Sequence, residues 1–216
     1  MDAINRRQLR TRSRAWPSAV ARALARSGVR PNQVSVASIL FAAVAGGAFY
    51  LAGTSANWAA ALWLVVAAAG IQLRLVCNLL DGLLAIEGGL KSKTGELFNE
   101  MPDRLADVLI LLGAGLGLRD YPWGLTLGWT AALLAVLTAY VRLLGGSLGL
   151  QQDFGGPMAK QHRMFAMTVG ALAAAAEHAV RGTRWALLAA LAVIVSGCVV
   201  TLVLRTRRIA RGLAAR

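Results

Sequence analysis

The sequence is short of charged residues, of acidic residues in particular, and of cysteine. Of its 216 residues only 15% are charged, and 10 are Asp or Glu. So small a charged fraction, beside 57% apolar residues and a mean hydropathy of +0.57, excludes a water-soluble enzyme. The two cysteines, Cys77 and Cys198, lie within apolar stretches and are too few for a disulfide framework.

Basic residues, in contrast, are plentiful. The chain has 23 Lys and Arg residues and a formal net charge of +13. In a soluble protein such an excess points to nucleic acid. Here the basic residues cluster between long apolar runs, so the excess indicates membrane orientation and contact with anionic lipids, with no nucleic-acid partner.

Six apolar windows are long enough to predict membrane-spanning helices, each of which needs about 20 mostly apolar residues. They cover residues 34–52, 59–86, 103–118, 123–144, 164–180 and 185–204. The sequence therefore predicts an all-α, polytopic membrane protein, with a basic interfacial segment at 1–33 and one six-helix domain at 34–216. The first window is too long for the apolar region of a signal peptide, so we expect it to be retained.

The N-terminal segment carries an apolar stripe among its arginines. Leu9, Trp16, Val20 and Leu24 recur at helical spacing, which favours an amphipathic helix lying in the membrane interface. A disordered basic tail and an organellar transit peptide are the alternatives.

Lys and Arg are distributed unevenly among the predicted loops. On one side of the membrane only Arg119, Arg181 and Arg184 are found, and the other side holds the rest, apart from Arg74 and Arg104 within the spans. The positive-inside rule then places both termini and the loop at 87–100 in the cytoplasm. We expect a multi-pass protein of the cell (inner) membrane.

Polar residues enter the apolar runs mainly around the end of the second span and the start of the third. Ionisable groups at membrane depth are costly and usually functional. One helical face of the second span presents Arg74, Asn78, Asp81 and Ala85. A matching face presents Gly95, Asn99, Asp103 and Asp107, provided that the third helix begins within the preceding loop. Pro102 then marks either the first turn of that helix or a kink.

Two facing helices with such oxygen ligands suit a hard cation. Mg²⁺ prefers carboxylate, carbonyl and water oxygens, and a bound cation would hold phosphates. The small residues Gly82 and Ala85 leave room for a substrate, as close helix packing also would. In the alternative interpretation, Arg74 and Arg104 simply neutralise two buried carboxylates.

This pattern resembles the signature of the CDP-alcohol phosphotransferases, D-x2-D-G-x2-A-R-x8-G-x3-D-x3-D. The register is kept without a gap, five of eight positions are identical, and two of the departures exchange Asp for Asn. In signature order the eight positions hold Asn78, Asp81, Gly82, Ala85, Ile86, Gly95, Asn99 and Asp103. Pro31-Asn32, followed by Val-Ser, and Asp103-Arg104 also resemble elements of the family.

The resemblance implies a cytoplasm-facing cavity in which a CDP-alcohol, with CDP-diacylglycerol the expected donor, is attacked by a second alcohol. CMP is released and a phosphodiester of phospholipid biosynthesis is formed. The lipid is then either the donor or the acceptor. The family also implies a divalent metal, Mg²⁺ or Mn²⁺, and a homodimer.

Residue roles are implied by the same resemblance. The metal-ligand positions hold Asn78, Asp81, Asn99 and Asp103, and Asp103 stands where the proton acceptor stands. The nucleotide region holds Gly82, Ala85 and Gly95. The candidates for contact with substrate or its phosphate are Arg74, Arg142, Lys160 and Arg163. The alternatives are an ion pair of Arg74 with Asp81 or Asp107, and a plain positive-inside origin for the other three.

The departures fall on the catalytic positions themselves. Asn78 and Asn99 replace two aspartates, and Ile86 replaces the signature arginine. The chain is then either a working variant with a less charged metal site or an inactive homologue that binds nucleotide or lipid. A small transporter is disfavoured because the sequence shows no internal repeat and no paired helix breaks.

Overall fold

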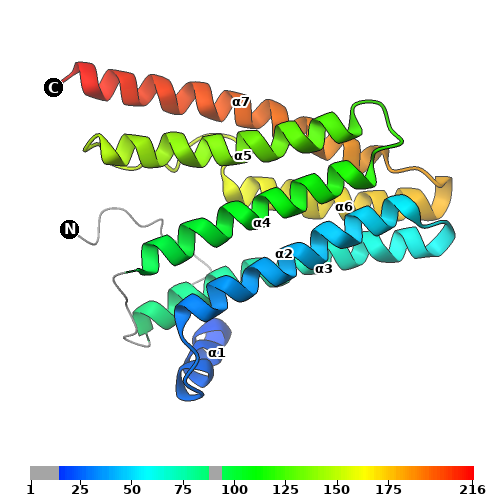
Figure 1. Ribbon diagram of the computed structural model, residues 1–216, viewed down its shortest axis with the longest axis horizontal. Coiled ribbons are helices and arrows are strands. Elements are labelled where there is room, and N and C mark those ends of the chain that lie inside the picture. The colour runs from blue at the N-terminus through cyan, green and yellow to red at the C-terminus, as the bar shows by residue number, and fades with distance from the viewer. Residues whose placement is uncertain (1–14, 88–93) are drawn as a thin grey trace.

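The computed structural model describes residues 15–87 and 94–216, and among these residues all regular structure is helical. The helices are α1 (Ala15–Arg26), α2 (Pro31–Thr54), α3 (Asn57–Glu87), α4 (Gly95–Gly117), α5 (Gly124–Ser147), α6 (Lys160–Arg181) and α7 (Trp185–Ala214). The longer helices α2 to α7 run side by side along the length of the molecule, and α1 lies across one end (Figure 1).

Four helices of the described chain are long and apolar enough to cross a membrane: α2, α3, α5 and α7. A polytopic membrane protein therefore fits the structure, whereas six spans do not follow from helix length and composition alone. The two remaining long helices, α4 and α6, lie alongside the others in Figure 1. Charged residues interrupt their apolar stretches, as Asp103, Arg104 and Asp107 do in α4.

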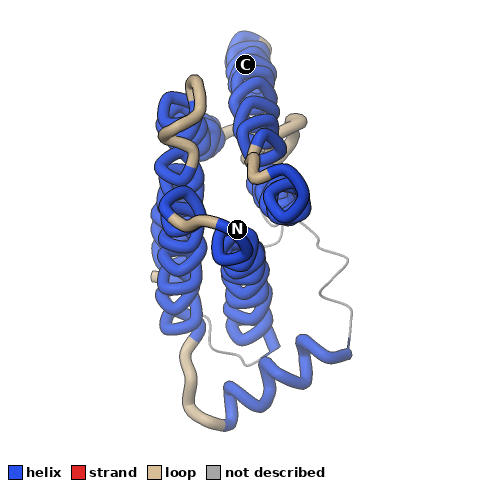
Figure 2. The backbone as a smooth tube through the Cα atoms, turned by 90° about the vertical axis from the view of Figure 1, so that its right-hand side faces the viewer, coloured by secondary structure: helices blue, strands red, loops and turns tan. Residues whose placement is uncertain are grey.

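The bundle is built from neighbouring pairs of helices. α2 packs against α3 and α4, α4 against α5, α3 against α6, and α7 against both α5 and α6. Viewed along the helices in Figure 2, α1 runs across the edge of the bundle, where it packs on α3. Residues far apart in the sequence, on α3, α4 and α6, are thereby brought together.

The structure confirms a helix within the basic N-terminal segment and excludes a disordered tail for residues 15–26. Ala21 of α1 is buried in one apolar cluster with Leu80 and Leu84 of α3. Trp16 and Val20 of the predicted stripe are instead 49% and 39% exposed. Two apolar side chains of α1 are therefore available to contact a membrane interface, as the stripe predicted. Leu9 and the other residues of 1–14 lie outside the described residues. So do residues 88–93, which include Lys91 and Lys93 of the loop predicted to be cytoplasmic.

Glycines let the backbones of α2, α4 and α5 approach closely. A Cβ added at Gly113 of α4 would lie 2.3 Å from the carbonyl oxygen of Gly46 on α2. A Cβ added at Gly115 would lie 2.7 Å from the Cα of Gly128 on α5. Such contacts between small residues hold membrane helices together, because lipid tails are as apolar as the side chains they would replace.

Candidate functional site

The signature residues lie where α3 ends and α4 begins. α4 starts inside the loop, at Gly95, so the condition for the matching face is met, whereas the apolar window at 103–118 began eight residues too late. Pro102 lies inside α4 beyond its first turn, so the first-turn alternative is wrong. Gly82 and Ala85 near the end of α3, and Gly95 at the start of α4, are all partly buried.

Asp103 is the residue on which this end of the bundle converges. It is 5% exposed, and its Oδ1 accepts a hydrogen bond of 2.8 Å from Asn78 Nδ2 and one of 3.3 Å from Arg74 Nη2. The ammonium group of Lys160 donates to the other oxygen, Oδ2. Three residues predicted for the site, two from α3 and one from α6, thus contact a fourth on α4.

Arg74 continues the network away from Asp103. Its side chain is fully buried, and its Nη2 lies 2.9 Å from Asp107 Oδ1. Arg163 Nη2 lies 2.6 Å from the other oxygen of Asp107 and is also buried. Charges therefore alternate from Lys160 to Asp103, Arg74, Asp107 and Arg163, across α3, α4 and α6. We call these five side chains the ionic chain.

The ionic chain contains ion pairs of the kind that two of the sequence alternatives expect, and whether Arg74 also contacts a substrate stays a prediction. Arg74 makes an ion pair with Asp107, and it also makes one with Asp103. Arg104, proposed as a neutralising partner, lies 3.8 Å from Asp103 and is more exposed, at 20%. A buried charge that loses its partner costs several kcal/mol, of the order of 3–5. These pairs therefore tie the three helices together whatever else they do.

The second aspartate, Asp81, has a different partner. Ser35 of α2 donates a hydrogen bond of 2.6 Å to Asp81 Oδ2. Asp81 is 6% exposed, and it lies near enough to Asp103 and Lys160 for their charges to interact. Sequence reasoning missed the role of Ser35. Its signal was the Val-Ser that follows Pro31-Asn32.

Two other predicted residues lie at the edge of the ionic chain. Asn99 is exposed, one turn before Asp103. Arg142 of α5 pairs with Glu100 of α4 at 2.6 Å and donates to Gln152 at 2.7 Å. Its guanidinium also lies 4.9 Å from the centre of the Phe154 ring. Arg142 therefore joins α4 to the segment after α5.

That segment, residues 148–159, is fastened by arginines of α7. Arg205 donates to the carbonyl oxygens of Gly155 at 3.0 Å and Thr138 at 2.6 Å. Arg205 is buried, so it has a structural role beyond that of a basic residue after the last span. Arg208 lies 2.9 Å from Asp153. Burial raises the pKa of Asp153, but hydrogen bonds from Arg208 and from the Gly155 N–H outweigh it and hold that pKa below its ordinary value.

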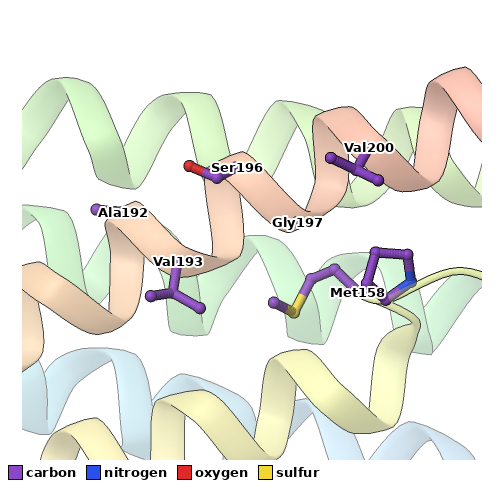
Figure 3. Close-up of a pocket in the computed structure, with 7 residues that line it drawn as sticks. Met158, Ala192, Val193, Ser196, Gly197 and Val200 are labelled. Carbon is purple, nitrogen blue, oxygen red and sulfur yellow. The ribbon is translucent and has the colours of Figure 1, made fainter.

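An apolar groove lies between α7 and residues 157–158 (Figure 3). It is lined by Pro157, Met158, Ala192, Val193, Ser196, Gly197 and Val200. This lining contains no charged or titratable side chain. Met158 connects the groove to the ionic chain, because its carbonyl oxygen accepts a hydrogen bond of 3.1 Å from Arg163. The groove itself offers no chemistry.

The donor set can be compared with what a metal requires. Within residues 15–87 and 94–216, no group of three or more His, Cys, Asp and Glu side chains is placed to hold a metal ion. The four signature positions supply two carboxylates and two amides. Mg²⁺ is commonly held by one or two carboxylates together with substrate phosphates. The residues present therefore suit one divalent cation completed by a substrate, and not two.

Comparison with known proteins shows which solved structures have the same fold. No protein-family model matches the sequence, and no curated protein does. Solved structures of a phosphatidylinositol phosphate synthase (PgsA1) from Mycobacterium tuberculosis do match. The form with manganese and citrate has a TM-score of 0.74 and 18% identity, covering 89% of this chain and 88% of that chain. The form with CDP-DAG bound has a TM-score of 0.72 and 22% identity, covering 89% and 92%.

These neighbours are members of the CDP-alcohol phosphotransferase family. The chain has the fold of that synthase. The resemblance inferred from the signature is thus confirmed at the level of fold, by a comparison over nearly the whole chain. The neighbour was crystallised with manganese in one form and with CDP-DAG in the other, and each of these is a property of that protein.

Proposed function

We propose that this protein transfers a substituted phosphate group from a CDP-alcohol to a second alcohol and releases CMP, in phospholipid biosynthesis. CDP-diacylglycerol is the expected donor. The observation that carries the proposal is the contact of Asn78 with Asp103 at the signature register, with Lys160 on the same carboxylate, within the fold of a synthase whose structure holds CDP-DAG.

The reaction assigns separate tasks to these side chains. The acceptor hydroxyl oxygen attacks the phosphorus that carries the donor alcohol, and the bond from that phosphorus to the CMP oxygen breaks. Asp103 takes the hydroxyl proton, while Lys160 stays beside its Oδ2 and neutralises its charge. Arg142, Lys160 and Arg163 supply positive charge toward phosphate, and Gly82, Ala85 and Gly95 leave space for the nucleotide.

A divalent cation, Mg²⁺ or Mn²⁺, belongs to the same proposal. Asp81 and Asp103, with the amide oxygens of Asn78 and Asn99, would hold it together with the donor diphosphate. The cation would supply neutralisation of the charge that develops on the leaving CMP.

The proposal includes an arrangement in the membrane. α4 and α6 join the four apolar helices as spans, since both run parallel to them (Figure 1). The site and both termini then face the cytoplasm from the inner membrane, and two copies form a homodimer. Single cysteines at Thr94 and Gly182 should be labelled by impermeant reagents from opposite sides of the membrane. Labelling of both from one side would contradict six spans.

The reaction is tested by incubating purified protein with labelled CDP-diacylglycerol and a panel of polar alcohols, in the presence of Mg²⁺ or Mn²⁺. Release of CMP that depends on one acceptor supports the proposal. Absence of CMP release with every acceptor and with other CDP-alcohols contradicts it.

A second candidate is an inactive homologue that binds nucleotide or lipid. The observation that favours it is the exchange of two signature aspartates for Asn78 and Asn99. Restoring both aspartates separates the two cases. A large gain in turnover would identify an impaired relic, whereas a loss would identify an enzyme adapted to the amides.

A further inference from the structure

Both carboxylate oxygens of Asp103 are already occupied by nitrogen donors. Oδ1 accepts from Arg74 and Asn78, and Oδ2 accepts from Lys160. A metal ion that uses Asp103 as a ligand must compete with a positive charge at each oxygen. The amide of Asn78 presents its N–H to Asp103, which a carboxylate at that position cannot do.

The carboxylates of this region are matched by cations without a metal ion. Asp81, Asp103 and Asp107 face Lys160, Arg74 and Arg163. Arg104, which pairs with Glu100, adds a further cation 3.8 Å from Asp103. Four aspartates at the signature positions would carry −4, enough for two divalent cations. The exchange of two of them for Asn78 and Asn99 removes the charge of one divalent cation.

The backbone that carries Lys160 is held by the fold and needs no ligand to be placed. The N–H of Met158, two residues earlier, donates to Thr201 Oγ1 at 2.9 Å. Arg205 fixes the carbonyl of Gly155 in the same segment. The ammonium group is therefore delivered to Asp103 by α6 and α7 together. Arg74 reaches Asp103 from α3, fully buried, and two of its nitrogens, Nε and Nη1, have no hydrogen-bond partner within the described residues.

We propose that Lys160, together with Arg74, is a built-in cation that takes the place of a second divalent metal at Asp103. One metal ion per site then suffices, on the side of Asp81. Lys160 acts here as a positioning and neutralising residue. That this site binds a CDP-alcohol and a divalent metal rests on the proposed function. The number of metal ions bound per chain can be measured without assuming that function.

The test counts metal ions rather than turnover. Free Mn²⁺ is followed by electron paramagnetic resonance while the full-length protein, in detergent and with saturating CDP, is titrated. The wild type should bind one Mn²⁺ per chain. Lys160→Met should bind a second Mn²⁺, or bind the first about ten-fold more tightly, because one positive charge beside the site has been removed.

Two control variants separate charge from structure. Lys160→Arg keeps the charge and should bind Mn²⁺ as the wild type does. Arg208→Gln changes a cation that fastens the same segment but does not contact Asp103, and it should also match the wild type. Two tight Mn²⁺ ions in the wild type, or equal binding by wild type and Lys160→Met, would overturn the proposal. A wild-type count of two would overturn the proposal even if Lys160→Met fails to fold, and that count can be made whether or not CMP is released.

Discussion

The two halves of α4 hold the bundle together in opposite ways. The first half carries Asp103 and Asp107, whose charges reach α3 and α6 through buried ion pairs. The second half carries Gly113 and Gly115, which let the backbones of α2 and α5 approach. The cations paired with the first half can also be bound by an anionic substrate, whereas the second half makes only close backbone contacts.

The difference shows how one helix separates chemistry from assembly. Ion pairs can be rearranged when an anionic substrate arrives, because their partners are flexible side chains. Backbone contacts at glycine cannot be rearranged without moving a helix. We therefore expect substitutions at Asp103 to change rate and metal binding, and substitutions at Gly113 and Gly115 to change stability alone.

The largest effect is expected for Asp103→Asn. The substitution removes the proton acceptor and a ligand together, each typically responsible for about 10²-fold or more in rate. Turnover should fall below detection in the CMP-release assay. The protein should remain folded, because Asp107 still pairs with Arg74 and Arg163, and Lys160, which loses its carboxylate, is 26% exposed and can be hydrated. Asp81→Asn should be similarly severe. Wild-type rates in the Asp103 variant would remove that residue from the mechanism.

Asp107→Asn should cost the most stability. It leaves the buried guanidinium groups of Arg74 and Arg163 short of a carboxylate, a loss of about 3–5 kcal/mol for a broken buried pair. The midpoint of unfolding in mixed detergent measures it. A loss of only about 0–1 kcal/mol in the free energy of unfolding, as for an exposed ion pair, would show that water reaches these side chains.

Gly113→Ala should destabilise the other half of α4 by about 1–3 kcal/mol, as overpacking does. The new methyl group would meet the backbone of Gly46 at 2.3 Å. Gly47→Ala is the matched control, since nothing lies within 4 Å of its added Cβ. Equal midpoints for the two variants would show that α2 and α4 are not in backbone contact.

The smallest effect is expected for Asp153→Asn. Its partner Arg208 is 52% exposed, and exposed pairs contribute about 0–1 kcal/mol. Because the pKa of Asp153 is depressed, its contribution is present above the ordinary value of about 3.9 and is lost as the pH falls through the lower folded-state pKa. In the wild type, hydrogen exchange of residues 148–159 should become faster as the pH falls through the folded-state pKa of Asp153. In Asp153→Asn it should already be faster at neutral pH.

The apolar windows predicted the helices well where apolar runs set their limits. The window 123–144 corresponds to Gly124–Ser147. The window 185–204 began correctly but ended ten residues early, because α7 continues as a basic helix to Ala214. Hydropathy cannot detect such an extension, since Arg205 and Arg208 are held there by the segment 148–159 rather than by lipid.

The candidate site was predictable on α3 and α4, because helical periodicity places Asn78 and Asp103 each on the polar face of its own helix. The partners from elsewhere were predictable only by residue type. Lys160 and Arg163 were expected near phosphate, but their pairing with Asp103 and Asp107 depends on how α6 packs against α3. The contact of Ser35 with Asp81 likewise depends on the packing of α2.

The contrast between the two halves of α4 is tested most directly by measuring two quantities in two variants. CMP release per folded molecule and the unfolding midpoint are determined for Asp103→Asn and Gly113→Ala beside the wild type. Asp103→Asn should lose CMP release and keep most of its midpoint, and Gly113→Ala should lower its midpoint and keep its CMP release. A fall in the same quantity for both variants would contradict the separation of chemistry from packing.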